Sequence, residues 1–229
     1  MDQTELLKEF DEKMSKNVET QCHLGQGYYP CITPVQIKRY VLDNPKWYTA
    51  YTPYQAEISQ GRLEMLHNFQ VLTERLTGLQ NSNCSLLDEA NGAIEAMLLA
   101  KRFYTRKHKD KDVFLLDVNC FEHIKQSLYS TAVQLDIKIV EVDWNNIDVE
   151  MQKSGLTVEQ FAEQFGSEMI KKADVGNDDV QESDPKARIF GGLFQNPNSL
   201  GLVFDYSNTA KLVQSFNGLA MLGTDFMYW

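Results

Sequence analysis

The sequence predicts an α/β protein whose sheet is mainly parallel, with helices on both faces. Short apolar runs alternate with amphipathic segments along the chain, at 113–117, 138–142, 187–194 and 219–223. Apolar strands that cannot face water on either side are typical of parallel sheets covered by helices, and the connections between them should be right-handed. With 229 residues, 43% of them hydrophobic, the chain is long enough to bury a sizeable core.

The part of the chain that precedes these strands is predicted to be helical. Residues 2–20 have apolar side chains at helical spacing. Thr33-Pro34 is typical of a helix start, with Thr as the N-cap and Pro in the first turn. A long amphipathic helix is expected over 59–77, ended by Gly78, and another over 88–104.

Helices over 121–135 and 206–216 are expected between the strands, but the stretch 144–186 departs from this rhythm. A capping box formed by Thr157 and Gln160 predicts one helix within it. The acidic tract DVGNDDVQESD follows that helix and lacks apolar content, which favours a solvated segment. We therefore expect 144–186 to be a mobile acidic excursion from the domain.

This pattern divides the chain into an N-terminal helical arm, 1–33, and one large α/β domain, 34–229, that carries the excursion. The formal net charge of −10 argues against a nucleic-acid partner, because phosphate binding needs a basic face. No apolar run approaches the ~20 residues that span a bilayer, so no membrane partner is expected. The acidic N-terminus is typical of neither a signal peptide nor a transit peptide.

The cysteines and histidines do not form a recognisable metal or nucleophile motif. The cysteines, which contain no C-x-x-C pair, are Cys22, Cys31, Cys84 and Cys120. The histidines are spread along the chain, and none pairs with a nucleophile in the sequence. A self-contained enzyme is therefore not favoured, and scattered cysteines suit a reducing compartment.

Parallel sheets bind ligands at the carboxyl ends of their strands, where three predicted loops gather. The first, 85–92, enters a helix whose free N–H groups attract anions, but Asp88 and Glu89 occupy that position and repel phosphate. The second, 117–121, directly follows a strand. The third, 195–201, is rich in turn residues that are either structural or part of a site.

A stretch rich in aromatic residues, WYTAYTPYQ at 47–55, precedes the helix expected over 59–77. A core needs aromatic rings but not their hydroxyls, because each buried hydroxyl demands a hydrogen-bond partner. The tyrosines of this stretch therefore indicate either an ordinary protein interface or the wall of a polar site.

The motifs YTPYQAEISQGRLE (51–64), LTGL (76–79) and SLLDEA (85–90) resemble the amino-terminal half of glycine decarboxylase, the P-protein of the glycine cleavage system. The resemblance extends over 23–229 apart from the acidic excursion. It implies the large domain of a fold-type-I pyridoxal-phosphate-dependent transferase, here truncated. In this family only the carboxyl-terminal half holds the Schiff-base lysine and binds the pyridoxal phosphate cofactor. No lysine follows Asp225, so no catalytic residue is expected in this chain.

The resemblance also implies an active-site pocket to which the amino-terminal half contributes side chains. The residues expected to line it are Tyr51, Tyr54, Gln55, Gln60 and Ser85. Tyrosine hydroxyls and a glutamine amide can orient a glycine carboxylate by hydrogen bonds without adding a competing base. The aromatic stretch is then the wall of a site for glycine.

The implied activity is decarboxylation of glycine and transfer of the aminomethyl group to the lipoyl carrier (H) protein. The implied partners are the lysine-bearing half and the H protein, in a homo- or hetero-oligomer that is mitochondrial in a eukaryote and otherwise cytoplasmic. Phe121 departs from the family, which usually has His there. The alternative is a truncated, non-catalytic paralogue that acts as an interaction module. In either case the strand at 219–223 should leave an open edge, and the helix at 59–77 an uncovered apolar face.

Overall fold

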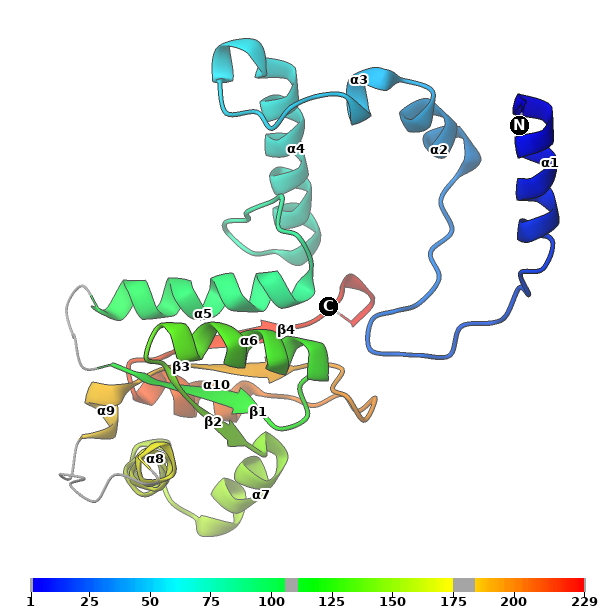
Figure 1. Cartoon of the computed structure of the whole chain (residues 1–229). Coiled ribbons are helices and arrows are strands. Elements are labelled where there is room, and N and C mark those ends of the chain that lie inside the picture. Colours follow the sequence, from blue (N-terminus) through cyan, green and yellow to red (C-terminus); the bar gives the residue numbers. More distant parts are fainter. Residues whose placement is uncertain (1, 106–110, 175–183, 229) are drawn as a thin grey trace. The chain divides into compact units, whose positions relative to one another are not determined.

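The computed structural model describes residues 2–105, 111–174 and 184–228, and its contacts divide the chain into two units, Met1–Tyr51 and Thr52–Trp229 (Figure 1). This division falls later in the chain than the expected boundary between 33 and 34. The helix that begins at Val35 therefore groups with the N-terminal arm and not with the α/β domain.

The first unit is helical and has no core of its own. α1 (Gln3–Met14) begins with a capping box, in which the side chains of Asp2 and Glu5 each accept from the other's backbone N–H. α2 (Val35–Leu42) and α3 (Pro45–Tyr48) follow a long connection. None of the residues 2–51 is buried. Packing within this unit therefore contributes little to its stability, since helices depend on the burial of an apolar face.

The second unit contains a four-stranded sheet in the order β2-β1-β3-β4, in which all neighbouring strands are parallel. The strands are β1 (Val113–Asp117), β2 (Lys138–Val142), β3 (Ile189–Gln195) and β4 (Leu219–Gly223). β1, β2 and β4 have the predicted bounds, and β3 begins two residues later than predicted. Every residue of β1 and β3 is buried. The prediction of a mainly parallel sheet is confirmed.

Helices cover both faces of this sheet (Figure 1). They are α5 (Glu89–Thr105), α6 (Glu122–Gln134), α7 (Trp144–Ser154), α8 (Val158–Ala173) and α10 (Ser207–Ser215). α5 and α6 pack with Phe114 and Leu116 on one face. α7, α8 and α10 pack with Leu115 and Val140 on the other. Successive side chains of a strand point to opposite faces, so the same strands supply both cores.

The expectation of a mobile excursion over 144–186 is wrong for residues 144–173, which form α7 and α8. The indole N–H of Trp144 donates to the Leu193 carbonyl at 3.2 Å, and the predicted capping box starts α8. The apolar side chains of α8 enter the core, because they recur at helical spacing on one side of the helix. The acidic tract at 175–183 lies outside the described residues.

α4 (Gln60–Thr77) is long and amphipathic, yet none of its residues is buried. Gly78 ends it with φ +72°, the left-handed C-cap that the sequence predicts. Phe69, Leu72 and Leu76 are all more than half exposed, which confirms the expected uncovered apolar face. The remaining short elements are η1 (Ala56–Ile58), α9 (Pro185–Arg188) and η2 (Phe226–Tyr228). Across the described ranges, no helix is long and apolar enough to cross a membrane.

Candidate functional site

The carboxyl ends of β1 and β3 form the topological switch point of the sheet. The chain leaves β1 to form β2 on one side and later places β3 on the other side. The loops that follow β1 and β3 therefore lead in opposite directions, which is where open parallel sheets bind ligands. Two of the predicted loops, 117–121 and 195–201, begin here. A hydrogen bond joins them, in which the Ser199 N–H donates to the Asn119 carbonyl at 2.8 Å.

Asp117, the last residue of β1, joins the two strands at the switch point. Its carboxylate accepts from the backbone N–H of Asn119 at 2.9 Å and of Gln195 at 3.2 Å. The Tyr206 hydroxyl lies 3.4 Å from this carboxylate and 3.1 Å from the Gln195 carbonyl, so two acceptors compete for its proton. Burial raises the pKa of Asp117, while these three donors oppose the rise. The carboxylate thus links the carboxyl ends of β1 and β3.

Gln195, the last residue of β3, connects the end of β3 to the loop after β1 and to the end of β4. Its side-chain carbonyl accepts from the Cys120 thiol at 3.5 Å, and its amide donates to the Gly223 carbonyl at 3.2 Å. A Cβ at Gly223 would lie 3.0 Å from the Gln195 side-chain oxygen, so a larger residue there would push the Gln195 side chain aside. Burial raises the pKa of Cys120 to about 12. The thiol is therefore protonated at neutral pH and does not act as a nucleophile.

Glu89 and His123 form a carboxylate–imidazole pair next to the same loops. Glu89 lies in the first turn of α5 and His123 in the first turn of α6, with 3.7 Å between a carboxylate oxygen and Nε2. Burial raises the pKa of Glu89, and His123 and Gln195 work against that rise. The imidazole stacks on Phe121, with ring centroids 5.9 Å apart. Three loop ends thus share one polar network, as the grouping of loops in the sequence predicts.

Sequence reasoning missed His123 and Tyr206 as members of this network. Each pairs with a carboxylate that is remote in the sequence, Glu89 and Asp117 respectively. The sequence feature that could have identified them is their position, because both lie at the start of a helix that follows one of the predicted loops.

The loop after β3 is held by its own amide side chains. The Asn196–Pro197 peptide is cis, and the Asn196 side chain both donates to and accepts from the backbone of Phe204, at 3.3 and 3.2 Å. The Asn198 side-chain oxygen accepts from the N–H groups of Leu200 and Leu202. These hydrogen bonds give the turn residues of this loop a structural role, whereas the Asn198 side-chain nitrogen is buried without a hydrogen-bond partner among the described residues. A role of the loop in a site stays a prediction.

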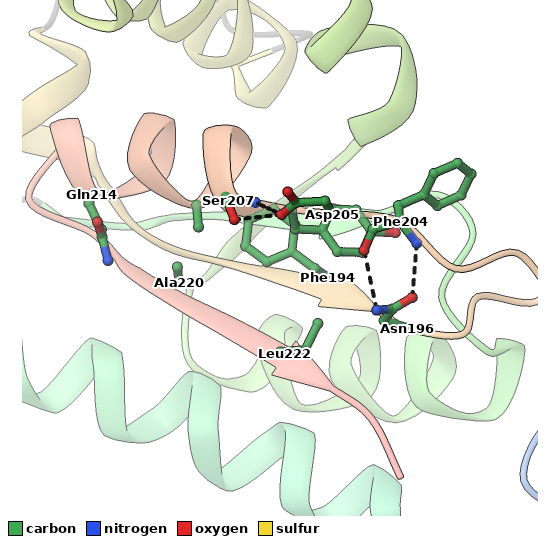
Figure 2. A pocket seen from close by; sticks show the side chains of 10 residues that line it. Phe194, Asn196, Phe204, Asp205, Ser207, Gln214, Ala220 and Leu222 are labelled. Carbon is green, nitrogen blue, oxygen red and sulfur yellow. Dashed lines mark hydrogen bonds between the residues drawn. The ribbon is translucent and has the colours of Figure 1, made fainter. Parts of the chain in front are cut away.

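A hollow of about 460 Å³ lies between β4 and α10, beside this loop (Figure 2). Ala220 and Leu222 form its wall on β4, and both point toward the side of the sheet that α10 covers. Among the polar groups that line it, Asn196 bonds with the Phe204 backbone, and the Asp205 carboxylate accepts from the N–H and hydroxyl of Ser207. Gln214 lines it from α10.

Acidic groups occupy the start of α5, which does not fit a phosphate. The Asp88 carboxylate accepts from the Asn91 N–H at 2.8 Å, and Glu89 lies in the same turn. A negative charge at a helix N-terminus repels an anion from it. Lys125 is paired as well, because its ammonium lies 2.8 Å from Glu141. In the part of the chain that the structure describes, no cluster of three or more His, Cys, Asp or Glu could hold a metal ion.

The five residues predicted to line a pocket all lie on exposed segments. Tyr51 belongs to the first unit and is 81% exposed, whereas Tyr54 belongs to the second and is 79% exposed. Gln55, Gln60 and Ser85 are exposed too. Gln60 is the first residue of α4, and Ser85 adopts a positive φ of 64° before α5. Their role in binding stays a prediction.

Comparison with known proteins gives one consistent result. A family model described as "Glycine cleavage system P-protein" matches residues 1–228. The glycine dehydrogenase (decarboxylating) of Roseobacter denitrificans is 34% identical over 225 residues, which cover 98% of this chain and 20% of that protein. The enzyme of the same name from Tropheryma whipplei is 54% identical over 119 residues, 52% of this chain and 12% of the relative.

The fold agrees with this result. A crystal structure of glycine decarboxylase (P-protein) of the glycine cleavage system, in inhibitor-bound form, superposes with a TM-score of 0.68 at 21% identity. The superposition covers 97% of this chain and 43% of that one. This chain therefore has the α/β architecture of the fold-type-I enzymes, as the resemblance implies, and it spans about a fifth of the length of the Roseobacter relative. The chain belongs to the glycine cleavage system P-protein family.

Proposed function

We propose that this chain is a working part of a glycine dehydrogenase (decarboxylating), the activity for which its relatives are named. The observation that carries the proposal is the match to the P-protein family across residues 1–228. Because the chain spans about a fifth of the Roseobacter relative, we assign it a share in the activity and not the whole. In this proposal, the lysine-bearing half of the enzyme supplies the Schiff-base lysine.

The side chains at the switch point of this chain do not fit pyridoxal phosphate. The cofactor needs an amine to hold it. Lys125 is paired with Glu141, and the Lys111 amine is buried against backbone carbonyls before β1. The cofactor also needs a cradle for its phosphate, and Asp88 and Glu89 fill the start of α5. We therefore assign the cofactor to the lysine-bearing half.

The proposed share of this chain is to orient glycine and to keep water away from it. The hydroxyls of Tyr51 and Tyr54 and the amide of Gln55 can each donate a hydrogen bond to the substrate carboxylate. Gln60 and Ser85, each just ahead of or at a helix start, add further polar groups. A carboxylate held by neutral donors keeps a fixed orientation without a competing base beside it.

The proposal is tested by mixing this chain with a separately produced lysine-bearing half, loaded with pyridoxal phosphate, and with lipoylated H protein. The measurement is the rate of glycine-dependent carbon dioxide release as the chain is added. We expect a rate that rises and then saturates at equal amounts, with little release from either polypeptide alone. A complex without a rate increase would favour the non-catalytic interaction module. If the mixture forms no complex and shows no rate increase, the proposal is overturned.

A further inference from the structure

The connection between α4 and α5, residues 78–88, forms neither helix nor strand. It begins at Gly78, whose left-handed backbone turns the chain back alongside α4 (Figure 1). It ends at the start of α5, where the Leu87 N–H donates to the Asn91 side-chain oxygen at 3.4 Å. The backbone groups of such a loop have no ladder partners, so side chains of neighbouring elements must hold it.

Two side chains of α4 hold this loop at Ser82. The Gln70 amide donates to the Ser82 carbonyl at 2.8 Å, and the Glu74 carboxylate accepts from the Ser82 N–H at 3.0 Å. Gln70 and Glu74 are four residues apart, so they lie on the same face of the helix, one turn apart. Both hydrogen bonds are partly buried. The N–H and the carbonyl of Ser82 are therefore both bound to one helix.

Ser85, three residues further on, has a backbone conformation that its neighbours must impose. Its φ of +64° lies in the left-handed region, which is unfavourable for a residue with a Cβ. Ser85 is exposed, so burial in the core does not fix this conformation. Conformations of this kind persist where the surrounding structure fixes them, and they are frequent at functional sites. The fixed points on either side of Ser85 are Ser82 and the start of α5.

We propose that Gln70 and Glu74 are positioning residues for Ser85: by holding the Ser82 backbone, they keep the Ser85 hydroxyl at the proposed glycine site. The inference rests on the proposed function, in which Ser85 is one of the polar groups that orient the substrate. Neither Gln70 nor Glu74 has to contact glycine, because a shift of about 1 Å in a group that orients a substrate can cost up to about a hundredfold in rate.

The two hydrogen bonds to Ser82 do not serve the core of the domain. In the part of the chain that the structure describes, neither hydrophobic core includes a residue of 60–88. Substitution of Gln70 or Glu74 should therefore change the melting temperature of the sheet domain little, since a partly exposed hydrogen bond contributes little to global stability. A change in the activity of the assembled enzyme would then come from the loop.

Hydrogen exchange of the chain alone tests whether α4 holds the loop. We expect the Ser82 amide to exchange about tenfold faster or more in Glu74→Ala, because its acceptor is removed. Glu74→Gln keeps a side-chain oxygen at the same place and should stay within about twofold of the wild type. The matched control is Glu163→Ala, which removes an exposed carboxylate from α8 and should not change exchange at Ser82. Unchanged exchange at Ser82 in Glu74→Ala would overturn the inference.

The kinetics of the reconstituted enzyme test whether Gln70 and Glu74 act through Ser85. We expect Gln70→Ala, Glu74→Ala and Ser85→Ala each to lower kcat/KM for glycine by about threefold to tenfold, the loss of one neutral hydrogen bond. In the Ser85→Ala background, Glu74→Ala should have no further effect, because the hydroxyl that it positions is gone. Glu74→Gln should keep kcat/KM within about twofold of the wild type. Gln164→Ala, at an exposed amide on α8, should leave it unchanged.

The outcomes separate this inference from the proposed function. If the effects of Glu74→Ala and Ser85→Ala multiply in the double variant, Glu74 does not act through Ser85, and the inference alone is overturned. It is also overturned if Ser85→Ala leaves kcat/KM unchanged in an active enzyme. If the wild-type mixture releases no carbon dioxide, the proposed function fails and the inference fails with it. Melting of each variant confirms that it folds, and Gln70→Ala replaces Glu74→Ala in the double variant if the latter does not.

Discussion

The two ends of the sheet are built from different chemistry. At the amino end, opposite charges meet: Arg188 donates to Asp112 at 2.9 and 2.8 Å and to Asp174, which also pairs with Lys138. At the carboxyl end, the Asp117 carboxylate accepts from backbone N–H groups and a tyrosine hydroxyl. The first end is arranged to stabilise the fold. The second keeps acidic and amide groups in a buried polar setting, as binding sites do.

Lys111 adds to the stabilising role of the amino end. Its buried amine donates to the carbonyls of Ile189 at 2.6 Å and Phe216 at 2.9 Å, and it lies 4.9 Å from the centre of the Tyr104 ring. Burial lowers its pKa to about 8. The amine is therefore protonated at neutral pH and ties the start of β3 to the turn before β4.

The largest effect is expected from Arg188→Ala at the amino end. The substitution removes the hydrogen bonds to Asp112 and Asp174 and leaves the Asp174 carboxylate, 6% exposed, with a smaller set of partners. Breaking a buried pair in this way destabilises by about 3–5 kcal/mol. Urea denaturation measures the loss. Lys172→Ala is the control, because it breaks an exposed pair with Glu168 and should change stability by less than about 1 kcal/mol.

A second, smaller effect concerns acid, where the two ends should respond in opposite directions. Hydrogen bonds from Arg188 and Lys138 hold the pKa of Asp174 down to about 2. The contribution of Asp174 to the free energy of unfolding is therefore complete above the ordinary aspartate pKa of about 4, and it is lost as the pH falls toward 2. Burial raises the pKa of Asp117, so ionising it weakens the fold. The stability lost when Asp117 ionises is therefore regained as the pH falls through the raised pKa toward about 4.

The pH prediction is checked with Asp174→Asn and Asp117→Asn against the wild type. The stability lost in Asp174→Asn, about 2 kcal/mol at pH 7, should shrink between pH 4 and pH 2. The stability of the wild type relative to Asp117→Asn should instead grow as the pH falls from 7 to about 4. Differences that change in the same direction would contradict the contrast between the two ends.

A third effect, smaller again, is expected from Gly223→Ala at the carboxyl end. The new Cβ would lie 3.0 Å from the Gln195 side-chain oxygen and push that side chain from the Cys120 thiol, at about 1 kcal/mol. Gly61→Ala is the matched control, because nothing lies within 4 Å of a Cβ there and alanine favours the helix. Equal melting temperatures for the two variants would show that the Gln195 contact is not tight.

The sequence predicted the strands better than it predicted the site. The apolar runs of β1, β2 and β4 end at charged, polar or glycine residues, so their bounds could be predicted to the residue. α7 was missed because its buried residues, Trp144 and Met151, are sparse on an otherwise polar helix. The gathering of loops followed from the parallel topology alone. The pairing of Glu89 with His123 did not, because it depends on how two helix starts lie beside each other.

The central claim is the proposal that the exposed segment around Tyr54 orients glycine, whereas the ion pairs at the amino end of the sheet stabilise the fold. Its most direct test measures kcat/KM and melting temperature together in the reconstituted two-polypeptide enzyme, for Tyr54→Phe and Arg188→Ala. We expect Tyr54→Phe to lower kcat/KM by about tenfold to a hundredfold, through one hydrogen bond to a charged substrate, with little change in melting. Arg188→Ala should lower the melting temperature and leave kcat/KM per folded molecule unchanged. A Tyr54→Phe enzyme that melts several degrees lower with unchanged kcat/KM would contradict the claim.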